Sequence, residues 1–441
     1  MKIDKIQNID AVVIGAGPAG LSCAKELLKH GKKVLIIFPH GNLRENIGGM
    51  ANQWHSQCAV LGETELQNSN MFMNWPIKFQ EYFDYIKEME EILEIHIKAN
   101  NDSQKILAIP EDNCSINKVK TIIGTNLKWS ELFALELSNP NLIQFDGEVI
   151  SILHEDKALG VILQNQNTLL FDPKIKMYLA TGCAKNTQIL NQSNFKDLTD
   201  SKVFGKYLAD HPMFENFELA GGNRRNFFEL FEDAKKSGRK YKEKTKYEVV
   251  INSKILGVFE IRHFYTKRSL DESRKVLSPF EIFKLIANRL AQKLFNQIIS
   301  KPLKSKLWIQ IAQDLNPSSK FTADKKGFYA NWELNQVDLE NYHKIISTAS
   351  ILLKQWGFAL KEIKRVENLK ELKESAISAY HPSGTTRAHQ SKEFGVVDSV
   401  GKFQGCDNLF ICGSSIFTTP GWANPTLTIM ALSTRTARLS N

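Results

Sequence analysis

Residues 11 to 31 read AVVIGAGPAGLSCAKELLKHG, and this stretch decides the fold. Its first four residues are an uninterrupted apolar run, which is typical of a buried parallel strand. Three glycines follow at once, and the apolar residues after them have helical spacing up to a stop at Gly31. A second apolar run, Val34 to Phe38, completes a strand–helix–strand unit.

The glycines in this unit predict a dinucleotide-binding turn. Gly15 allows the tight turn, Gly17 lets the backbone approach a pyrophosphate, and Gly20 lets the helix pack closely on the strand. Pro18 and Ala19 lie between them, where the helix N-terminus faces the phosphate charge. A lone glycine motif is weak, but its place between two apolar runs makes dinucleotide binding the favoured interpretation.

The second apolar run departs from the usual dinucleotide pattern. It ends in Phe38, where an acidic residue normally binds the ribose hydroxyls. The ribose contact must therefore come from elsewhere, such as backbone groups or His40. The glycine turn alone also suits a nicotinamide-linked dehydrogenase, which stays open as an alternative.

Composition narrows the class of protein. The chain has 441 residues, a formal charge of +9 and 42% hydrophobic residues, which suits two or three globular domains. Its start lacks the apolar core of a secretory signal, and no stretch has the roughly 20 apolar residues of a membrane span. Six cysteines without a CxxC pair argue against a disulfide framework or metal site and suit a cytoplasmic protein. Because no nucleic-acid motif accompanies the basic residues, we expect no nucleic-acid partner.

The last 60 residues carry a second set of signals. Residues 408 to 412 (NLFIC) form another apolar run, closed by Gly413, and a loop of small residues follows. Pro425 suits the first turn of a helix, and Asn424 suits its N-cap. We therefore expect a strand, a ligand-approaching loop and a final helix.

The order of motifs resembles the glucose–methanol–choline (GMC) family of FAD-dependent oxidoreductases. Each motif alone is weak, but together they follow the family's order. The segment GGMANQW looks most like the sugar-oxidising branch that includes pyranose oxidase. The matching segments are GAGPAG (15–20), GGMANQW (48–54), LATGCAKNTQIL (179–190), FGKYLADHP (204–212), HPSGTTR (381–387), GVVD (395–398), NLFICGSSIFTT (408–419) and ANPTLT (423–428).

The resemblance implies an α/β fold: a Rossmann-like FAD-binding domain plus an antiparallel-sheet substrate domain. The FAD-binding domain would comprise residues 1–212 and 376–441, and the substrate domain residues 213–375. Pyranose oxidase tethers its flavin through a histidine just before the tryptophan of GGMANQW. Gln53 stands there in this chain, so the resemblance implies non-covalent FAD.

The resemblance also implies the residues of the reacting centre. His381, in HPSGT, matches the histidine that removes the proton of an alcohol while hydride passes to the flavin N5. Asn424, in ANPT, matches the polar residue that orients the hydroxyl. An unperturbed imidazole has a pKa of about 6.5, which suits a base near neutral pH.

Other motif positions are expected to hold FAD. Gly413 and Ser414 would lie under the isoalloxazine, and Thr181 and Gly182 near the nucleotide half. Val149, taken as the end of a strand, would hold the adenine through its backbone. The remaining expected contacts are Gly49, Met50, Asn52, Trp54, Pro425 and Thr426.

The partner expected from these motifs is a small-molecule alcohol, with a carbohydrate favoured by GGMANQW, and the electron acceptor is oxygen, a quinone or a protein.

Residues 278–308 have the pattern of an amphipathic helix followed by lysines. It either packs on the sheet or contacts an anionic membrane surface. A degenerate flavin- or glycan-binding protein remains a further alternative, because Ala388 and His389 depart from the family's usual loop.

Overall fold

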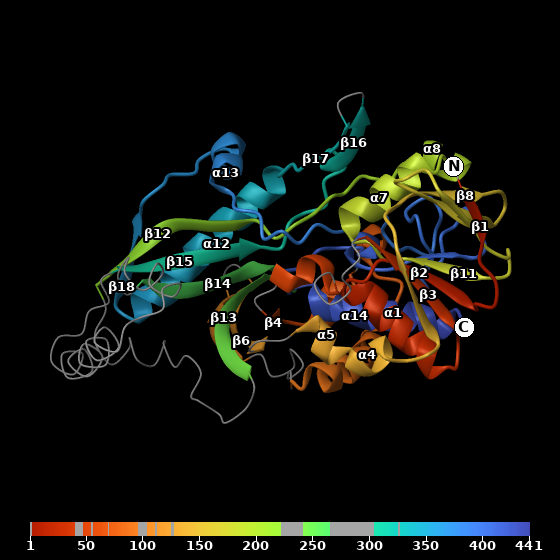
Figure 1. Ribbon diagram of the computed structural model, residues 1–441. Coiled ribbons are helices and arrows are strands. Elements are labelled where there is room, and N and C mark those ends of the chain that lie inside the picture. The colour runs from red at the N-terminus through yellow and green to blue at the C-terminus, as the bar shows by residue number, and fades with distance from the viewer. Residues whose placement is uncertain are drawn as a thin grey trace, which may run out of the picture.

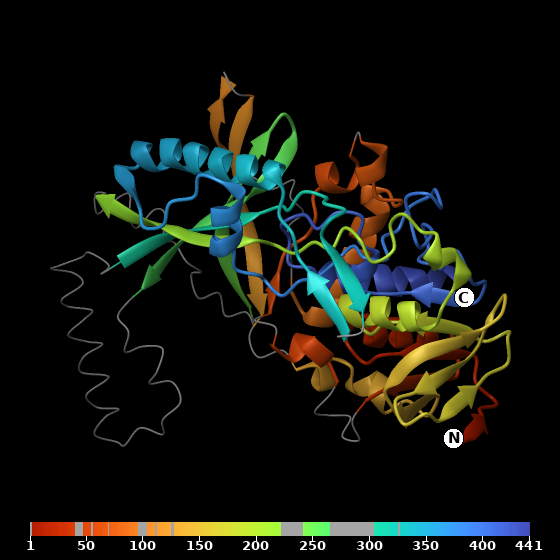
Figure 2. The same ribbon diagram turned by 90° about the horizontal axis from the view of Figure 1, so that it is seen from above.

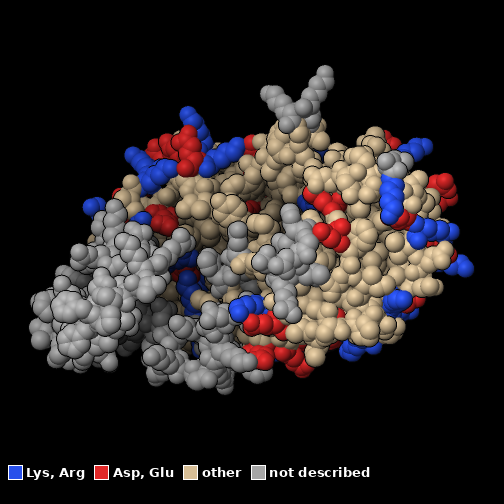
Figure 3. All heavy atoms as spheres, viewed as in Figure 1, with Lys and Arg blue, Asp and Glu red and all other residues tan. Residues whose placement is uncertain are grey.

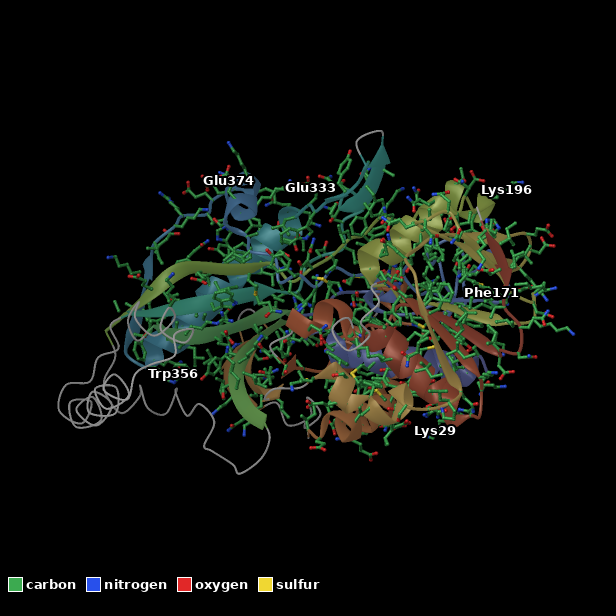
Figure 4. The ribbon with its side chains drawn as sticks, in the orientation of Figure 1. Lys29, Phe171, Lys196, Glu333, Trp356 and Glu374 are labelled. Atoms are coloured by element: carbon green, nitrogen blue, oxygen red, sulfur yellow. The ribbon has the colours of Figure 1, made fainter. Side chains whose placement is uncertain are left out.

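The computed structural model describes residues 2–39, 47–53, 56–68, 70–95, 104–110, 113–124, 128–221, 241–264, 304–324 and 327–441. These residues form two lobes (Figure 1). One lobe is built on a parallel sheet and the other on an antiparallel sheet. In Figure 4, Phe171 and Lys29 lie on the first lobe and Trp356 lies on the second. The predicted α/β class is confirmed.

The parallel sheet has the strand order β19–β11–β2–β3–β7. Its first two strands in sequence are joined by helix α1 (Pro18–Lys29), as the glycine-rich stretch predicts. All its described neighbours pair in parallel, and the central strands are fully buried. The strands are β2 (Ala11–Ile14), β3 (Val34–Phe38), β7 (Leu142–Asp146), β11 (Lys176–Leu179) and β19 (Leu409–Ile411).

The two faces of the parallel sheet belong to different hydrophobic clusters. Ala11 and Val13 of β2 pack with α1 and with the end of α14 (Thr426–Leu439). Val12 and Ile14 point to the other face. This alternation explains the uninterrupted apolar run, because both faces of a covered parallel strand are buried. Helix α4 (Phe79–Leu93) lies outside α14 and pairs with it through Glu81 and Arg435, 2.7 Å apart.

A smaller sheet of order β1–β10–β9–β8 lies over the other face. It corrects one expectation: Val149 begins strand β8 rather than ending the preceding strand. β7 stops at Asp146, and the N–H of Gly147 makes the last bond to β3 by donating to the carbonyl of Phe38 at 2.9 Å. The strands are β1 (Ile3–Lys5), β8 (Val149–His154), β9 (Ala158–Leu163) and β10 (Thr168–Leu170).

The second lobe is an antiparallel sheet of order β18–β12–β15–β14–β13–β6–β4, with β5 paired to β6. One face is covered by α12 (Gln336–Gln355), which lies along the strands in Figure 2. The strands are β4 (Gln57–Cys58), β5 (Gln104–Ile109), β6 (Cys114–Gly124), β12 (Met213–Gly221), β13 (Tyr241–Ile251), β14 (Lys254–Phe264), β15 (Lys304–Ile311) and β18 (Phe358–Glu362).

This sheet crosses the predicted domain boundary. β6 comes from the segment assigned to the FAD-binding domain, yet it pairs with β13 from Cys114↔Ile251 to Gly124↔Tyr241. Residues 104–124, which the prediction assigns to the FAD-binding domain, thus complete a sheet of the later segment, and the domain bounds stay a prediction.

Shorter elements connect the lobes, and β16 and β17 form a hairpin beside residues 205–208. No helix among the described residues is both long and apolar enough to cross a membrane. Residues 265–303, which hold most of the expected amphipathic helix, lie outside the described residues. The remaining elements are η1 (Gly49–Gln53), α3 (Glu63–Leu66), η2 (Met71–Met73), α5 (Trp129–Leu132), α6 (Ala134–Leu137), α7 (Cys183–Gln192), α8 (Lys196–Thr199), β16 (Lys320–Asp324), β17 (Gly327–Asn331), α13 (Leu369–Ser375) and η6 (Ser414–Ile416).

Candidate active site

The glycine-rich turn has the geometry that its sequence predicts. Gly15 has a φ of +106°, and a Cβ there would lie 2.5 Å from the carbonyl oxygen of Ala180. A Cβ on Gly20 would lie 1.8 Å from the carbonyl oxygen of Gly15. Both positions therefore require glycine, the first for its turn and the second for close packing of helix on strand.

Gly17 differs from the other two glycines because the space beside it is open. The nearest described atom to a Cβ there would be the carbonyl oxygen of Gly48, 4.0 Å away. Gly48 is itself tied to the turn, since its N–H donates to Ala16 O at 2.9 Å. Gly49 follows, and a Cβ on Gly49 would lie 3.7 Å from the Cα of Gly17. The start of GGMANQW thus lies beside the predicted pyrophosphate site.

The rest of that segment is only partly described. Met50 is 76% exposed, and Asn52 is also exposed. Trp54 and the possible ribose contact His40 lie outside the described residues.

Three segments meet at the carboxyl edge of the parallel sheet, next to the turn. Thr181 and Gly182 follow β11, and Gly182 is the N-cap of α7. Gly413 follows β19, and a Cβ there would lie 3.7 Å from the Cβ of Ala19. The expected residues Thr181, Gly182, Gly413 and Ser414 therefore lie together at the edge where ligands bind in open α/β sheets.

Asn186 joins these segments and was missed by the sequence analysis. Its side-chain oxygen accepts from the N–H and hydroxyl of Thr181, both at 2.8 Å. Its amide nitrogen donates to Cys412 O at 2.9 Å and to the Ser415 hydroxyl at 3.0 Å. The signal was present in LATGCAKNTQIL, but only the fold shows that one amide satisfies four groups.

The start of the last helix corrects the expected role of Asn424 as an N-cap. Pro425 flanks α14 with helical dihedrals, and no side chain of the described residues caps the helix there. Thr426 is its first residue. The Asn424 side-chain oxygen is buried and has no hydrogen-bond partner among the described residues. It is therefore available to a bound molecule.

The loop of His381 is held by Asp210. One carboxylate oxygen of Asp210 accepts from the backbone N–H of His211 at 2.6 Å and from that of His381 at 3.1 Å. The other accepts from the Ser378 hydroxyl. Tyr380, just before His381, has a φ of +59°, so the chain turns sharply there. Nδ1 of His381 is buried and has no hydrogen-bond partner among the described residues.

His211 connects the His381 loop to the Asn424 loop. Its ring lies edge-on to that of His381, with centroids 5.3 Å apart. Its Nδ1 lies 3.0 Å from the carbonyl oxygen of Gly421, three residues before Asn424. His211 is thus a positioning residue between the loops of the two expected site residues.

Burial keeps both imidazoles neutral. It lowers the pKa of His381 below its usual value, and the charge of Lys246 lowers it further against the opposing effect of Asp210. Burial likewise lowers the pKa of His211, with a further contribution from His381. A neutral imidazole has a lone pair, so His381 can accept a proton at neutral pH.

Family models match two parts of the chain. The GMC oxidoreductase C-terminal model matches residues 317–433, which include His381 and Asn424. The FAD-binding domain model matches residues 10–47, around the glycine turn. Residues 317–433 thus carry a segment similar to the C-terminal part of GMC oxidoreductases.

Solved structures resemble this chain in fold. Pyridoxine 4-oxidase from Mesorbium loti is 12% identical with a TM-score of 0.57, covering 98% of this chain and 99% of that one. A formate oxidase variant from Aspergillus oryzae RIB40 is 13% identical with a TM-score of 0.58, covering 100% and 98%. At this identity the two structures show the fold alone.

One curated relative is closer over a short stretch. The 6'''-hydroxyparomomycin C oxidase of Streptomyces lividus is 43% identical over 58 residues. The match spans 13% of this chain and 11% of the length of that relative.

The described residues of this chain fit an FAD. Helices α1, α7 and α14 and the short η6 begin without a hydrogen-bonded side-chain cap among the described residues. Uncapped N-termini offer backbone N–H groups and positive dipole ends to phosphates or to an anionic ring. Val149 begins β8 close to the end of β3, where the adenine is expected.

The departures at Ala388 and His389 do not disturb the loop in which they lie. Nε2 of His389 lies 3.0 Å from Met71 O, and its Nδ1 accepts from the Ser391 N–H at 2.9 Å. Ala388 is buried, and its N–H donates to Ile416 O at 2.8 Å. The histidine therefore ties the loop to η2, and the altered residues leave the His381 loop intact. No cluster suited to a metal ion occurs among the described residues.

Proposed function

We propose that the protein oxidises an alcohol to a carbonyl compound with FAD, using His381 as the base and Asn424 to orient the hydroxyl. One observation carries the proposal: His381 Nδ1 and Asn424 Oδ1 are buried without partners among the described residues, on loops joined by His211. Buried polar atoms are normally hydrogen-bonded, so two such atoms at one site indicate a place for a polar ligand.

The chemistry follows from these two atoms. The alcohol O–H gives its proton to the His381 imidazole, and the Asn424 side chain fixes the hydroxyl by hydrogen bonding without taking or giving a proton. A bound FAD would supply the acceptor for the hydride of the alcohol carbon, which becomes a carbonyl carbon. Asp210 contributes by holding the backbone of His381 in place, and such positioning supplies much of the rate of a two-body reaction.

The substrate class that we propose is a sugar, polyol or related cyclic alcohol, and the FAD is bound non-covalently. Both proposals rest on GGMANQW and on Gln53 within it. Oxygen, a quinone or a protein reoxidises the flavin.

The experiment is anaerobic reduction of the purified flavoprotein by a panel of sugars and polyols, followed at the visible flavin bands. Precipitation with acid tests the attachment of FAD, because a non-covalent flavin leaves the pellet. The variant His381→Ala should reduce the flavin about 10²–10⁴-fold more slowly if His381 is the base. His343, exposed on α12, provides a matched control histidine.

Each outcome of this experiment has a clear meaning. Visible flavin bands that one alcohol bleaches support the proposal. A loss in the His381 variant no greater than in His343→Ala would assign the base elsewhere. A protein that takes up no FAD would leave a degenerate binding protein as the better interpretation.

A further inference from the structure

The antiparallel sheet has a polar face opposite α12. Tyr247, Phe259 and Ile309 pack in the cluster that includes α12. The alternate residues Lys246, Glu260 and Trp308 lie side by side on the other face, because they are neighbours in register across β13, β14 and β15. Val258 on the same face packs in the core of the nucleotide lobe. This face therefore looks toward the flavin-binding lobe.

The charges on this face do not balance. Lys244 pairs with Glu260 at 2.8 Å, and Arg262 pairs with the same carboxylate oxygen. Burial raises the pKa of Glu260, but Lys246, Arg262 and Lys244 together bring it below its usual value. One carboxylate thus faces three cations.

Lys246 is the cation without a carboxylate of its own. It is only 4% exposed, and its Nζ donates to the side-chain oxygen of Gln310 at 3.1 Å. No ion pair joins it to a carboxylate within the described ranges of the chain. Burial lowers its pKa to about 8, with Lys244 and Arg262 opposing its charge as well. An ammonium has three donors, and only one is used here.

Two further buried acids are weakened as counter-ions. Glu248 accepts from Trp422 Nε1 at 2.9 Å and from the Asn117 amide at 3.2 Å, and burial raises its pKa. Burial also raises the pKa of Glu65 to about 8, and the charge of Glu248 adds to the effect. Burial thus favours the neutral form of both carboxyls, which weakens them as counter-ions for Lys246.

Lys246 belongs to the surroundings of His381. Gln310 connects Lys246 to the loop that carries Asn424, because its amide nitrogen donates to Trp422 O at 2.7 Å while its oxygen accepts from Lys246. The Lys246 ammonium lies 5.5 Å from the centre of the Trp422 ring, two residues before Asn424. Its charge also lowers the pKa of both His381 and His211. Figure 3 shows a few basic and acidic atoms between tan and grey ones in the region of β13 and β14.

We propose that Lys246 determines specificity by binding an anionic group, a carboxylate or phosphate, of an alcohol substrate whose hydroxyl lies at His381 and Asn424. This inference rests on the proposed alcohol oxidation and adds the charge of the substrate. An anion at Lys246 would use its remaining donors and offset the excess positive charge of the face. A buried ammonium paired in this way is stabilised, whereas a neutral alcohol leaves it unpaired.

Binding without turnover tests the inference apart from the reaction. Calorimetric titration of the FAD-loaded protein would use D-glucuronate, D-glucose 6-phosphate and D-glucose, so that carboxylate, phosphate and neutral forms are compared. The wild type should bind one of the anions more tightly than glucose. The variant Lys246→Met should weaken binding of that anion roughly 10- to 100-fold, as expected for a lost charge-assisted hydrogen bond, and leave glucose unchanged.

Lys306→Met is the matched control. Lys306 lies on the same face but has its own partner, Glu215, at 2.9 Å, so its loss should not weaken the anion selectively. A flavin spectrum identical to that of the wild type shows that each variant is folded and loaded. Equal losses for glucose and the anion in Lys246→Met, or no binding of either anion by the wild type at millimolar concentration, would overturn the inference.

A second measurement needs no variant. Binding of the anion by the wild type should weaken as the pH rises through about 8, where Lys246 loses its proton, while glucose binding stays level. Binding that strengthens or stays level over this range would also overturn the inference. If glucose reduces the flavin and neither anionic sugar does, the proposed oxidation stands and the proposed preference for an anionic substrate is refuted. The charged or titratable groups near Lys246 are Lys244, Glu248, Glu260, Arg262, Glu65, His211 and His381.

Discussion

Two glycines in the nucleotide-binding turn separate folding from cofactor binding. In Gly20→Ala the new Cβ would lie 1.8 Å from Gly15 O, against a closest real approach of 3.0 Å. Helix α1 must therefore move by about 1.2 Å, and overpacking of this kind costs about 3 kcal/mol. The unfolding free energy of this variant should fall even without FAD.

Gly17→Ala should behave in the opposite way. Gly17 has a φ of −77°, which alanine adopts freely, and the nearest atom to its Cβ would be 4.0 Å away. The protein stripped of flavin should therefore melt like the wild type. With FAD, however, the methyl group fills the space beside the turn where the pyrophosphate is expected. A wild type held at 100 times its Kd gains about 2.7 kcal/mol from ligand, and this variant should lose most of that gain.

The assay is thermal unfolding of the three proteins with and without added FAD, together with titration of FAD fluorescence. The expected pattern is a lower Tm of Gly20→Ala in both conditions and a lost FAD-dependent shift in Gly17→Ala. Wild-type FAD affinity in Gly17→Ala would refute the placement of the pyrophosphate at this turn. An unchanged Tm of flavin-free Gly20→Ala would refute the close packing.

Three further predictions concern buried polar groups. Because burial lowers the pKa of His381, the rate of flavin reduction should stay level from neutral pH downward and fall only below about pH 6.5, and His381→Gln should remove this acid limb. Asn186→Ala should lower the unfolding free energy by about 3 kcal/mol, since it orphans four buried groups, whereas exposed Asn191→Ala on the same helix should change it little in urea denaturation. Folding raises the pKa of Glu65 from 4.5 to about 8, so the folded state binds the extra proton, and the unfolding free energy should decline as the pH rises between these values. The variant Glu65→Gln should flatten this decline, and an equal decline in both proteins would contradict the raised pKa of Glu65.

Local sequence patterns were sufficient where the interacting residues are close in sequence. The strand–helix–strand unit from Ala11 to Phe38 forms as predicted, because its apolar runs and glycines act on one another within a few turns of chain. The position of Gly413 beside Ala19 was reached only through the resemblance, since no periodicity links two segments so far apart.

Long-range pairing explains most of what was missed. β6 reads as a strand that could join either lobe, and only its register with β13 decides between them. Likewise Asp210 gives no sign in the sequence that it holds the backbone of His381. The unpaired state of Lys246 is equally invisible, because it depends on which carboxylates the register brings near.

The structure describes the environment of Phe38, where the usual pattern has an acidic residue. The Phe38 side chain is buried, and its carbonyl accepts from the N–H of Gly147. The ribose contact expected at His40 lies outside the described residues, so this part of the prediction stays a prediction.

The closeness of Gly413 to Ala19 has a consequence for folding during synthesis of the chain. The two residues are separated by roughly 400 positions, and β19 is the edge strand of its sheet. A ribosome adding about 5–20 residues each second needs on the order of a minute to pass from one to the other. During that time the first strand–helix–strand unit is exposed without its last strand and without α14. We therefore expect the FAD site at this edge of the sheet to be complete only after β19 and α14 have been synthesised.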